Sequence, residues 1–213
     1  MAKSFDSLPE RGALAEIASV FYQRGWMFGT AGNLSARART MPDNYWITAS
    51  GVPKGQLEES DFLRISVASM EVIEQINPYN KPSAETSIHQ VIYRSVPDAG
   101  ACMHVHSIAS CQVTNDVGEG ATELPLPNVE MLKGLGVWEE NPTVSIPLFE
   151  NHLDVPTIAR QIEQRLSISP PRVPALLIRN HGVTVWGSSI QEAFNRTECI
   201  EFIFAFLAQR RCR

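Results

Sequence analysis

The feature that most constrains this chain is a pair of histidines, His104 and His106, at the end of the short apolar run that begins at Ala101. Residues two apart in an extended strand point to the same face, so both imidazoles can be directed at one point. Neutral imidazole binds zinc readily, and a catalytic zinc has three protein ligands and one open position. The pattern therefore predicts half of a metal site at the end of a buried strand. The alternative is a hydrogen-bonded histidine pair without a metal.

The third ligand must come from elsewhere in the chain. His181 lies in a tight turn between two apolar stretches, 174–178 and 183–186, which we expect to be strands. A turn held by strands on both sides fixes a side chain more firmly than a loop does. We therefore prefer His181 as the third ligand to its rivals, His89 and His152.

Composition limits the kind of protein. With 213 residues and 44% hydrophobic content, we expect residues 1–213 to form a single globular domain. No apolar run is long enough to cross a bilayer, and the first residues lack the apolar core of a signal peptide, which favours the cytoplasm. The formal charge of -5 offers no general attraction to nucleic acid. We therefore expect a small-molecule partner, and neither nucleic acid nor a membrane.

The cysteines agree with a cytoplasmic location. They form no Cys-x-x-Cys pair and no disulfide-like spacing, so reduced thiols are the simpler interpretation. The residues concerned are Cys102, Cys111, Cys199 and Cys212.

Hydrophobic periodicity predicts an α/β chain of the α+β type. The stretch 71–76 alternates charged and apolar residues, as a half-exposed antiparallel strand does. A capping box, Ser7 with Glu10, would open the first helix, and Ser83 would be the N-cap of a later one. The expected helices are 7–24, one from 83 onward, 107–114, 154–166 and 189–210, and the expected strands include 45–49, 62–66, 71–76, 101–106, 142–148, 174–178 and 183–186.

Two loops of small residues are candidates for binding an anion. The stretches 29–35 and 50–55 could present main-chain N–H groups and hydroxyls to a phosphate, with Lys54 nearby as a point charge. Ser83, at the expected start of a helix, would add a hydroxyl where unpaired N–H groups favour negative charge. The alternative is that both loops are ordinary turns.

Two carboxylates are candidates for moving protons. Glu85 lies in the first turn of the helix expected from Ser83, where it could also serve only to complement the helix dipole. Glu130 lies in a short helical turn with largely apolar neighbours, which would raise its pKa toward neutrality. The alternative for Glu130 is an exposed side chain paired with Lys133.

Five motifs, in this order, resemble the class II (zinc-dependent) aldolase family: Gly-Thr-Ala-Gly-Asn-Leu-Ser, Thr-Ala-Ser-Gly, Pro-Ser-Ala-Glu, His-Val-His and Arg-Asn-His-Gly. The resemblance runs from about Leu14 to Leu207. It implies a three-layer fold, with a central, mainly antiparallel sheet flanked by helices, and usually a homotetramer with active sites between subunits. Phrases that resemble the dehydratases of the family begin at Glu130, Trp138, Ile146 and Leu177.

The resemblance also implies roles for single residues. His104, His106 and His181 match the ligands of one Zn²⁺ per subunit. Glu85 matches the acid/base glutamate of the aldolases, which can also ligate the metal, and Glu130 matches the proton-transfer glutamate of the dehydratases. The positions that match phosphate-binding residues are Gly32, Asn33, Ser50, Gly51 and Ser83, whereas Ala84 stands where aldolases of the family commonly have a second serine.

The implied activity is dehydration of a sugar phosphate that carries a ketone at carbon 2. Zinc would bind the oxygens on carbons 2 and 3 and stabilise the enediolate formed when the proton on carbon 3 leaves. Loss of the hydroxyl on carbon 4 would then give a 2,3-diketone after tautomerisation. The alternatives are a sugar-phosphate aldolase or 4-epimerase, and a non-catalytic domain like the adducin head, which needs no metal.

Overall fold

A single sheet forms the centre of the computed structural model, which describes residues 4–115 and 117–210. Within those residues its strands are β1 (Asn33–Ala38), β2 (Met41–Thr48), β3 (Phe62–Ser66), β4 (Val72–Gln75), β5 (Ala101–Val105), β6 (Glu123–Pro125), β7 (Ser145–Phe149), β8 (Ala175–Ile178) and β9 (Gly182–Gly187). Their order is β4-β3-β2-β1-β5-β9-β8-β7-β6. Only β7 and β8 run parallel among these pairs. The prediction of a mainly antiparallel sheet is confirmed.

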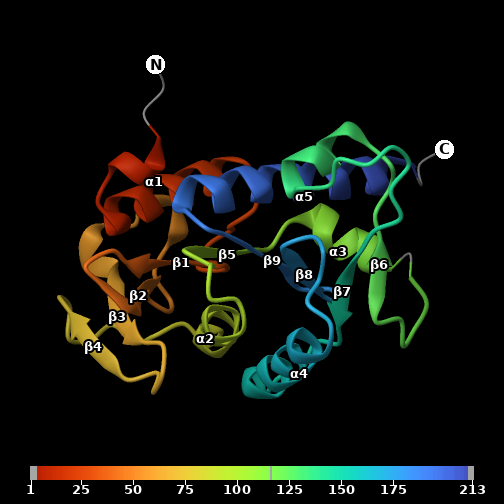
Figure 1. Ribbon diagram of the computed structural model, residues 1–213. Coiled ribbons are helices and arrows are strands. Elements are labelled where there is room, and N and C mark those ends of the chain that lie inside the picture. Colours follow the sequence, from red (N-terminus) through yellow and green to blue (C-terminus); the bar gives the residue numbers. More distant parts are fainter. Residues whose placement is uncertain (1–3, 116, 211–213) are drawn as a thin grey trace.

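Helices cover both faces of this sheet, as Figure 1 shows. One face carries α1 (Glu10–Gln23) and α5 (Ile190–Arg210), and the other carries α2 (Thr86–Ser95) and α4 (Val155–Ile168). The arrangement is the expected three-layer sandwich. The shorter elements are α3 (Ile108–Thr114) and four 3₁₀ helices, η1 (Phe5–Ser7), η2 (Lys54–Gln56), η3 (Glu59–Asp61) and η4 (Glu130–Leu135), of which η4 packs against α5.

Two hydrophobic cores lie on opposite sides of the sheet, and β5 contributes to both. Met103 and Val105 belong to the core under α1 and α5, whereas Cys102 belongs to the core with α2 and α4. Side chains alternate along a strand, so His104 points to the same side as Cys102, toward α2. Burial on both faces explains why this strand reads as a continuous apolar run.

The first helix ends where the sequence predicts but begins differently. The apolar residues of α1 that recur at helical spacing are fully buried, namely Leu14, Ile17, Ala18 and Phe21. Gly25 follows the helix with a φ of 72°. The predicted capping box is wrong, because the Ser7 hydroxyl donates to the Ser4 carbonyl and the Glu10 carboxylate accepts the N–H of Arg39. Pro9 occupies the N-cap position instead.

The second helix also begins later than predicted. Its N-cap position is Glu85, and the prediction of Ser83 at that position is wrong. Both the N–H and the hydroxyl of Thr86 donate to the Ser83 carbonyl, which forms a turn before the helix starts. This shift places the Glu85 carboxylate at the N-terminal end of α2.

Among the described residues, no helix is both long and apolar enough to cross a bilayer. Cys102, Cys111 and Cys199 are free thiols, as expected. Cys212 lies outside the described residues.

One buried carboxyl group in α5 has no obvious partner. Glu201 is 2% exposed, and neither of its oxygens has a hydrogen-bond partner among the described residues. Burial raises the pKa of Glu201 to about 7, although the nearby Ser107 hydroxyl opposes the shift. An unfolded glutamate has a pKa of about 4.3, so the folded chain holds this proton more tightly. Its contribution to stability is therefore complete below about pH 4.3 and is lost as the pH rises toward 7.

We expect Glu201→Gln to remove this pH dependence. Between pH 5 and pH 8, the free energy of unfolding of the wild-type protein should fall by about 3 kcal/mol more than that of the variant. Urea unfolding at several pH values measures this difference. Glu198→Gln, on the same helix but in a partly exposed pair with Arg24, should keep the wild-type slope. Equal slopes in all three proteins would contradict the assignment.

Candidate metal centre

Strand pairing brings the three predicted histidine ligands together. His104 is near the end of β5, His106 follows that strand, and His181 occupies the turn between β8 and β9. Strand β9 pairs with β5, with Thr184 opposite His104, so the turn lies beside the end of β5. Glu85 reaches the same point from the start of α2.

The turn that carries His181 depends on its neighbours. Asn180 has a φ of 50°, in the left-handed region that asparagine tolerates better than most residues. A Cβ atom at Gly182 would overlap the Val105 carbonyl and press on the His106 ring. Glycine is therefore required at position 182 for His181 and His106 to approach each other.

The four side chains form a compact set of possible ligands. One ligand atom from each of Glu85, His104, His106 and His181 lies within 4.8 Å of all the others. The Nε2 atoms of His104 and His106 are 2.8 Å apart. Glu85 Oε1 lies 3.2 Å from His104 Nε2 and 2.8 Å from His181 Nε2.

Protonation and hydrogen bonding suit these atoms to a cation. Burial, together with the neighbouring His104, lowers the pKa of His106 to about 3, which keeps its ring neutral. Burial alone would raise the pKa of Glu85, but the imidazoles of His104 and His181 hold it well below its usual range. Glu85 Oε1 is buried without a hydrogen-bond partner among the described residues. A carboxylate oxygen and neutral imidazoles are ligands that a metal ion accepts.

Thr184 supports this arrangement and was missed by the sequence analysis. Its hydroxyl lies 2.9 Å from His104 Nδ1, on the far side of the ring from the other histidines. A partner at Nδ1 fixes the ring and leaves Nε2 for a metal. The available signal was a polar residue inside the apolar run Val183-Thr184-Val185.

The two rival histidines do not join the set. His89 is fully buried, and its ring nitrogens are paired with Ser35 and Asn33. His152 is exposed after β7. The residues present therefore fit one metal ion, which His104, His106 and His181 would hold together with Glu85.

The loops predicted to bind a phosphate converge beside this set. Ala49 forms a β-bridge with Pro82, and the N–H of Ser50 donates to the Lys81 carbonyl, which joins the second loop to the segment before α2. The N–H of Lys54 donates to the Gly29 carbonyl, which joins the two loops to each other.

Two glycines of these loops adopt left-handed backbone conformations. Gly32 and Gly51 have φ values of 80° and 73°, and a Cβ at Gly32 would crowd the carbonyl oxygen of His104. Ser50 and Gly51 are exposed, and Ser83 is half-buried. Gly32 thus links the first loop to the histidines. The Asn33 side chain is already engaged, because its amide nitrogen donates to Glu85 Oε2.

Lys54, which was predicted to be a point charge near the second loop, is a buried cation. Its side chain is 1% exposed, and its ammonium group donates to the carbonyls of Val52, at 2.9 Å, and Ala49, at 3.4 Å. Burial lowers the pKa of Lys54 to about 8, although Asp61 and Glu85 oppose the shift. The ammonium group of Lys54 therefore stabilises the second loop by donating to two of its carbonyl groups.

Glu130 lies apart from the four ligands. It begins η4, its side chain is 80% exposed, and it forms an ion pair with Lys133 at 2.7 Å. The expected apolar surroundings of Glu130 are therefore wrong for the single chain, because η4 buries Leu132 and Leu135 and turns Glu130 outward. Its catalytic role stays a prediction.

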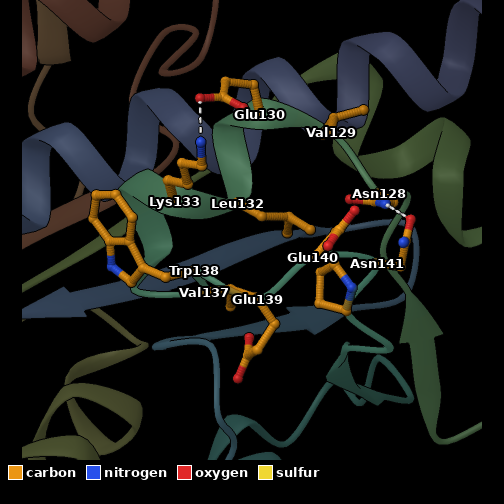
Figure 2. Close-up of a pocket in the computed structure, with 11 residues that line it drawn as sticks. Asn128, Val129, Glu130, Leu132, Lys133, Val137, Trp138, Glu139, Glu140 and Asn141 are labelled. Atoms are coloured by element: carbon orange, nitrogen blue, oxygen red, sulfur yellow. Dashed lines mark hydrogen bonds and ion pairs between the residues drawn. The ribbon is translucent and has the colours of Figure 1, made fainter.

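Glu130 also lies on the other side of the sheet from His104. Leu132 and Leu135 belong to the core under α1 and α5, whereas His104 points toward α2. Figure 2 shows Glu130 at a pocket between η4 and the segment that follows it, with Glu139 and Glu140 on that segment. None of the four cluster residues lines this pocket.

Comparisons with known proteins agree with this architecture. The model of the class II aldolase and adducin N-terminal domain family matches residues 12–207. A methylthioribulose-1-phosphate dehydratase from Microcystis aeruginosa is 52% identical over 197 residues, which cover 92% of this chain and 94% of that protein. One from Leptospira biflexa is 45% identical over 200 residues, which cover 92% and 95%.

Solved structures show the same fold. YgbL from Escherichia coli superposes with a TM-score of 0.76 at 27% identity and covers 95% of this chain and 88% of its own. The l-fuculose-1-phosphate aldolase from Thermus thermophilus has a TM-score of 0.72 at 21% identity and covers 95% of each chain. The second similarity shows the fold alone.

We expect His181→Ala to weaken binding of a divalent metal by roughly 100-fold or more, because about 10–16 kcal/mol of zinc-binding free energy is shared among four ligands in structural sites. Competition with a chromophoric chelator measures the affinity. His152→Ala, which removes the exposed rival, should bind the metal as the wild type does. Equal affinities in all three proteins would exclude His181 as a ligand.

Proposed function

Because the chain belongs to the class II aldolase and adducin N-terminal domain family, we propose that it dehydrates 5-methylthioribulose 1-phosphate to 5-methylthio-2,3-dioxopentyl phosphate. This reaction is a step of methionine salvage. The observation that carries the proposal is the cluster of three imidazoles and one carboxylate beside the two glycine-containing loops. The choice of substrate follows the dehydratases that match nearly the whole chain.

We assign the metal as Zn²⁺, one per subunit, held by His104, His106 and His181. When bound, the ion would supply Lewis-acid stabilisation of negative charge that develops on the ketose oxygens. Glu85 completes the donor set and has a supporting acid/base role. Its position at the start of α2 favours the ionised form, since a helix N-terminus carries partial positive charge.

The converging loops would bind the phosphate of the substrate. Exposed main-chain N–H groups and hydroxyls can surround phosphate oxygens, and left-handed glycines allow the backbone to turn toward them. The buried ammonium of Lys54 would add positive charge from beneath and hold the second loop in place. The proposed phosphate-binding residues are Gly32, Asn33, Ser50, Gly51, Ser83 and Lys54.

Glu130 is our candidate for moving protons during the elimination. One chain does not bring Glu130 to the cluster, since η4 lies across the sheet from His104. We therefore propose a homotetramer in which Glu130 of one copy reaches the metal set of a neighbour. The exposure of Glu130, which is paired only with the half-exposed Lys133, and of Trp138, which is 72% exposed, supports this arrangement, because another copy can contact both side chains. The free thiols support a cytoplasmic location.

The purified protein should release water from methylthioribulose 1-phosphate and show no comparable turnover of fuculose 1-phosphate or ribulose 5-phosphate. A coupled assay with all three substrates measures this preference, and removal of the metal with a chelator should abolish the activity. Aldol cleavage or epimerisation as the main activity would replace the proposal with one of its rivals. Inactivity on all three substrates in metal-loaded protein would favour a non-catalytic domain.

We expect Glu130→Gln to lower kcat for dehydration by roughly 100-fold or more, in the range typical of a lost general acid or base. Glutamine keeps the shape of the side chain but cannot exchange a proton. Glu140→Gln is the matched control, because Glu140 lines the same pocket, and it should retain most of the activity. Near-normal dehydration by Glu130→Gln would exclude the assignment.

A further inference from the structure

A series of buried hydrogen bonds leads from Glu85 into the core between the sheet and α2. Asn33 donates its amide N–H to Glu85 Oε2, and its carbonyl oxygen is paired with His89 Nε2. His89 Nδ1 lies 2.7 Å from Ser35 Oγ, which in turn lies 2.7 Å from the Tyr93 hydroxyl. All five side chains are at most 8% exposed. We call Asn33, His89, Ser35 and Tyr93 the relay.

The ionised carboxylate decides how each group in the relay is oriented. A carboxylate only accepts hydrogen bonds, so the Asn33 amide must present N–H to Glu85 and its oxygen to His89. That oxygen only accepts, so His89 must carry its proton on Nε2. A flipped Asn33 would place its oxygen against the carboxylate and leave both oxygens without a donor.

The orientation continues to the far end of the relay. Burial lowers the pKa of His89 to about 3, so its ring is neutral and Nδ1 is an acceptor. Ser35 must then donate to Nδ1, in preference to the Cys102 carbonyl at 3.4 Å. With its proton used, Ser35 accepts from the Tyr93 hydroxyl. Each group therefore has one allowed role.

The two oxygens of Glu85 consequently have different surroundings. Oε2 is held by the relay, and Oε1 faces His104 and His181 without a hydrogen-bond partner among the described residues. A proton on Oε2 would meet the N–H of Asn33, which is repulsive. Any metal ion or proton taken up by Glu85 must therefore arrive at Oε1.

We propose that His89, Ser35 and Tyr93 are positioning residues, which fix the Asn33 amide so that Glu85 presents Oε1 alone to the imidazoles. This inference rests on the proposed metal site but does not depend on which sugar phosphate is the substrate. Partners that orient metal ligands change metal affinity or activity by about 10–100-fold when they are lost. A network that only filled the core would change stability and leave metal affinity unaltered.

The first test measures the tautomer of His89 in metal-free protein. In ¹⁵N-histidine-labelled protein, Nε2 of His89 should give the signal of a protonated ring nitrogen, and Nδ1 that of an unprotonated one. Loss of the signals in His89→Gln identifies them. A proton on Nδ1 would reverse the deduced orientation and overturn the proposal.

The second test measures zinc affinity by competition with a chromophoric chelator. His89→Leu should bind Zn²⁺ about 10–100-fold more weakly than the wild type. His89→Gln should recover most of the loss, because the glutamine amide can still donate to Asn33. Gln90→Leu is the matched control: Gln90 is also buried on α2, but its amide donates to the carbonyls of Val67 and Ala68, so zinc affinity should not change.

Unchanged zinc affinity in His89→Leu, or an equal loss in Gln90→Leu, would overturn the proposal. If His89→Leu does not fold, Ser35→Ala takes its place, since it removes the donor to Nδ1 and should weaken zinc binding by about tenfold. Failure of the proposed function would look different. The wild-type protein would then bind zinc, and the variants would lose it as expected, but methylthioribulose 1-phosphate would not be dehydrated.

Discussion

The antiparallel pairing of β5 with β9 is the constraint on which the site depends. It places Thr184 opposite His104 and carries the turn with His181 to the end of β5. Close approach of the two backbones is possible only because position 182 is glycine. The ladder fixes both strands over five residue pairs, so the geometry of the imidazoles is set by main-chain hydrogen bonds in the centre of the sheet.

The buried carboxylate of Glu85, at the start of α2, faces the three imidazoles. Leaving Glu85 ionised in the core would be costly without partners. Imidazoles on one side and the Asn33 amide on the other provide them. These contacts are made from the N-cap position of α2, which begins at Thr86 after the turn formed with the Ser83 carbonyl. The local start of the helix is therefore adapted to the site.

Much of the fold was predictable from the sequence, because periodicity reports burial directly. The helices α1 and α2 and the continuous apolar run of β5 have the predicted structure. The stretch at β4 is a strand as predicted, although its two apolar residues, Val72 and Ile73, are exposed. The errors lie at helix starts. There, the Ser7 hydroxyl donates to the Ser4 carbonyl, and Pro9 and Glu85 occupy the N-cap positions without a side-chain capping hydrogen bond. The Glu10 carboxylate, which the capping box would need, instead accepts the N–H of Arg39, a partner that local spacing does not reveal.

The clustering of the candidate ligands was predictable where they share a strand or a turn, whereas contacts between neighbouring strands, or between a strand and a helix, were not. His104 and His106 are two residues apart, and the turn around His181 has a distinctive sequence. Thr184 and Ser35 become important only through strand register and through helix α2. The sequence places Lys54 in a loop of small residues but does not reveal that its ammonium group is buried and donates to the loop backbone.

The position of Glu130 follows from the same layered architecture. A sheet covered on both faces keeps side chains of opposite layers apart, and η4 belongs to the layer of α5 while Glu85 belongs to that of α2. A group required at the metal from η4 must therefore come around the sheet or from another copy of the chain. Since η4 is anchored by Leu132 and Leu135 in the core, movement within one chain would cost that burial. Bringing Glu130 to the metal cluster of another copy of the chain would cost less free energy than moving η4, because both layers of each chain would stay packed.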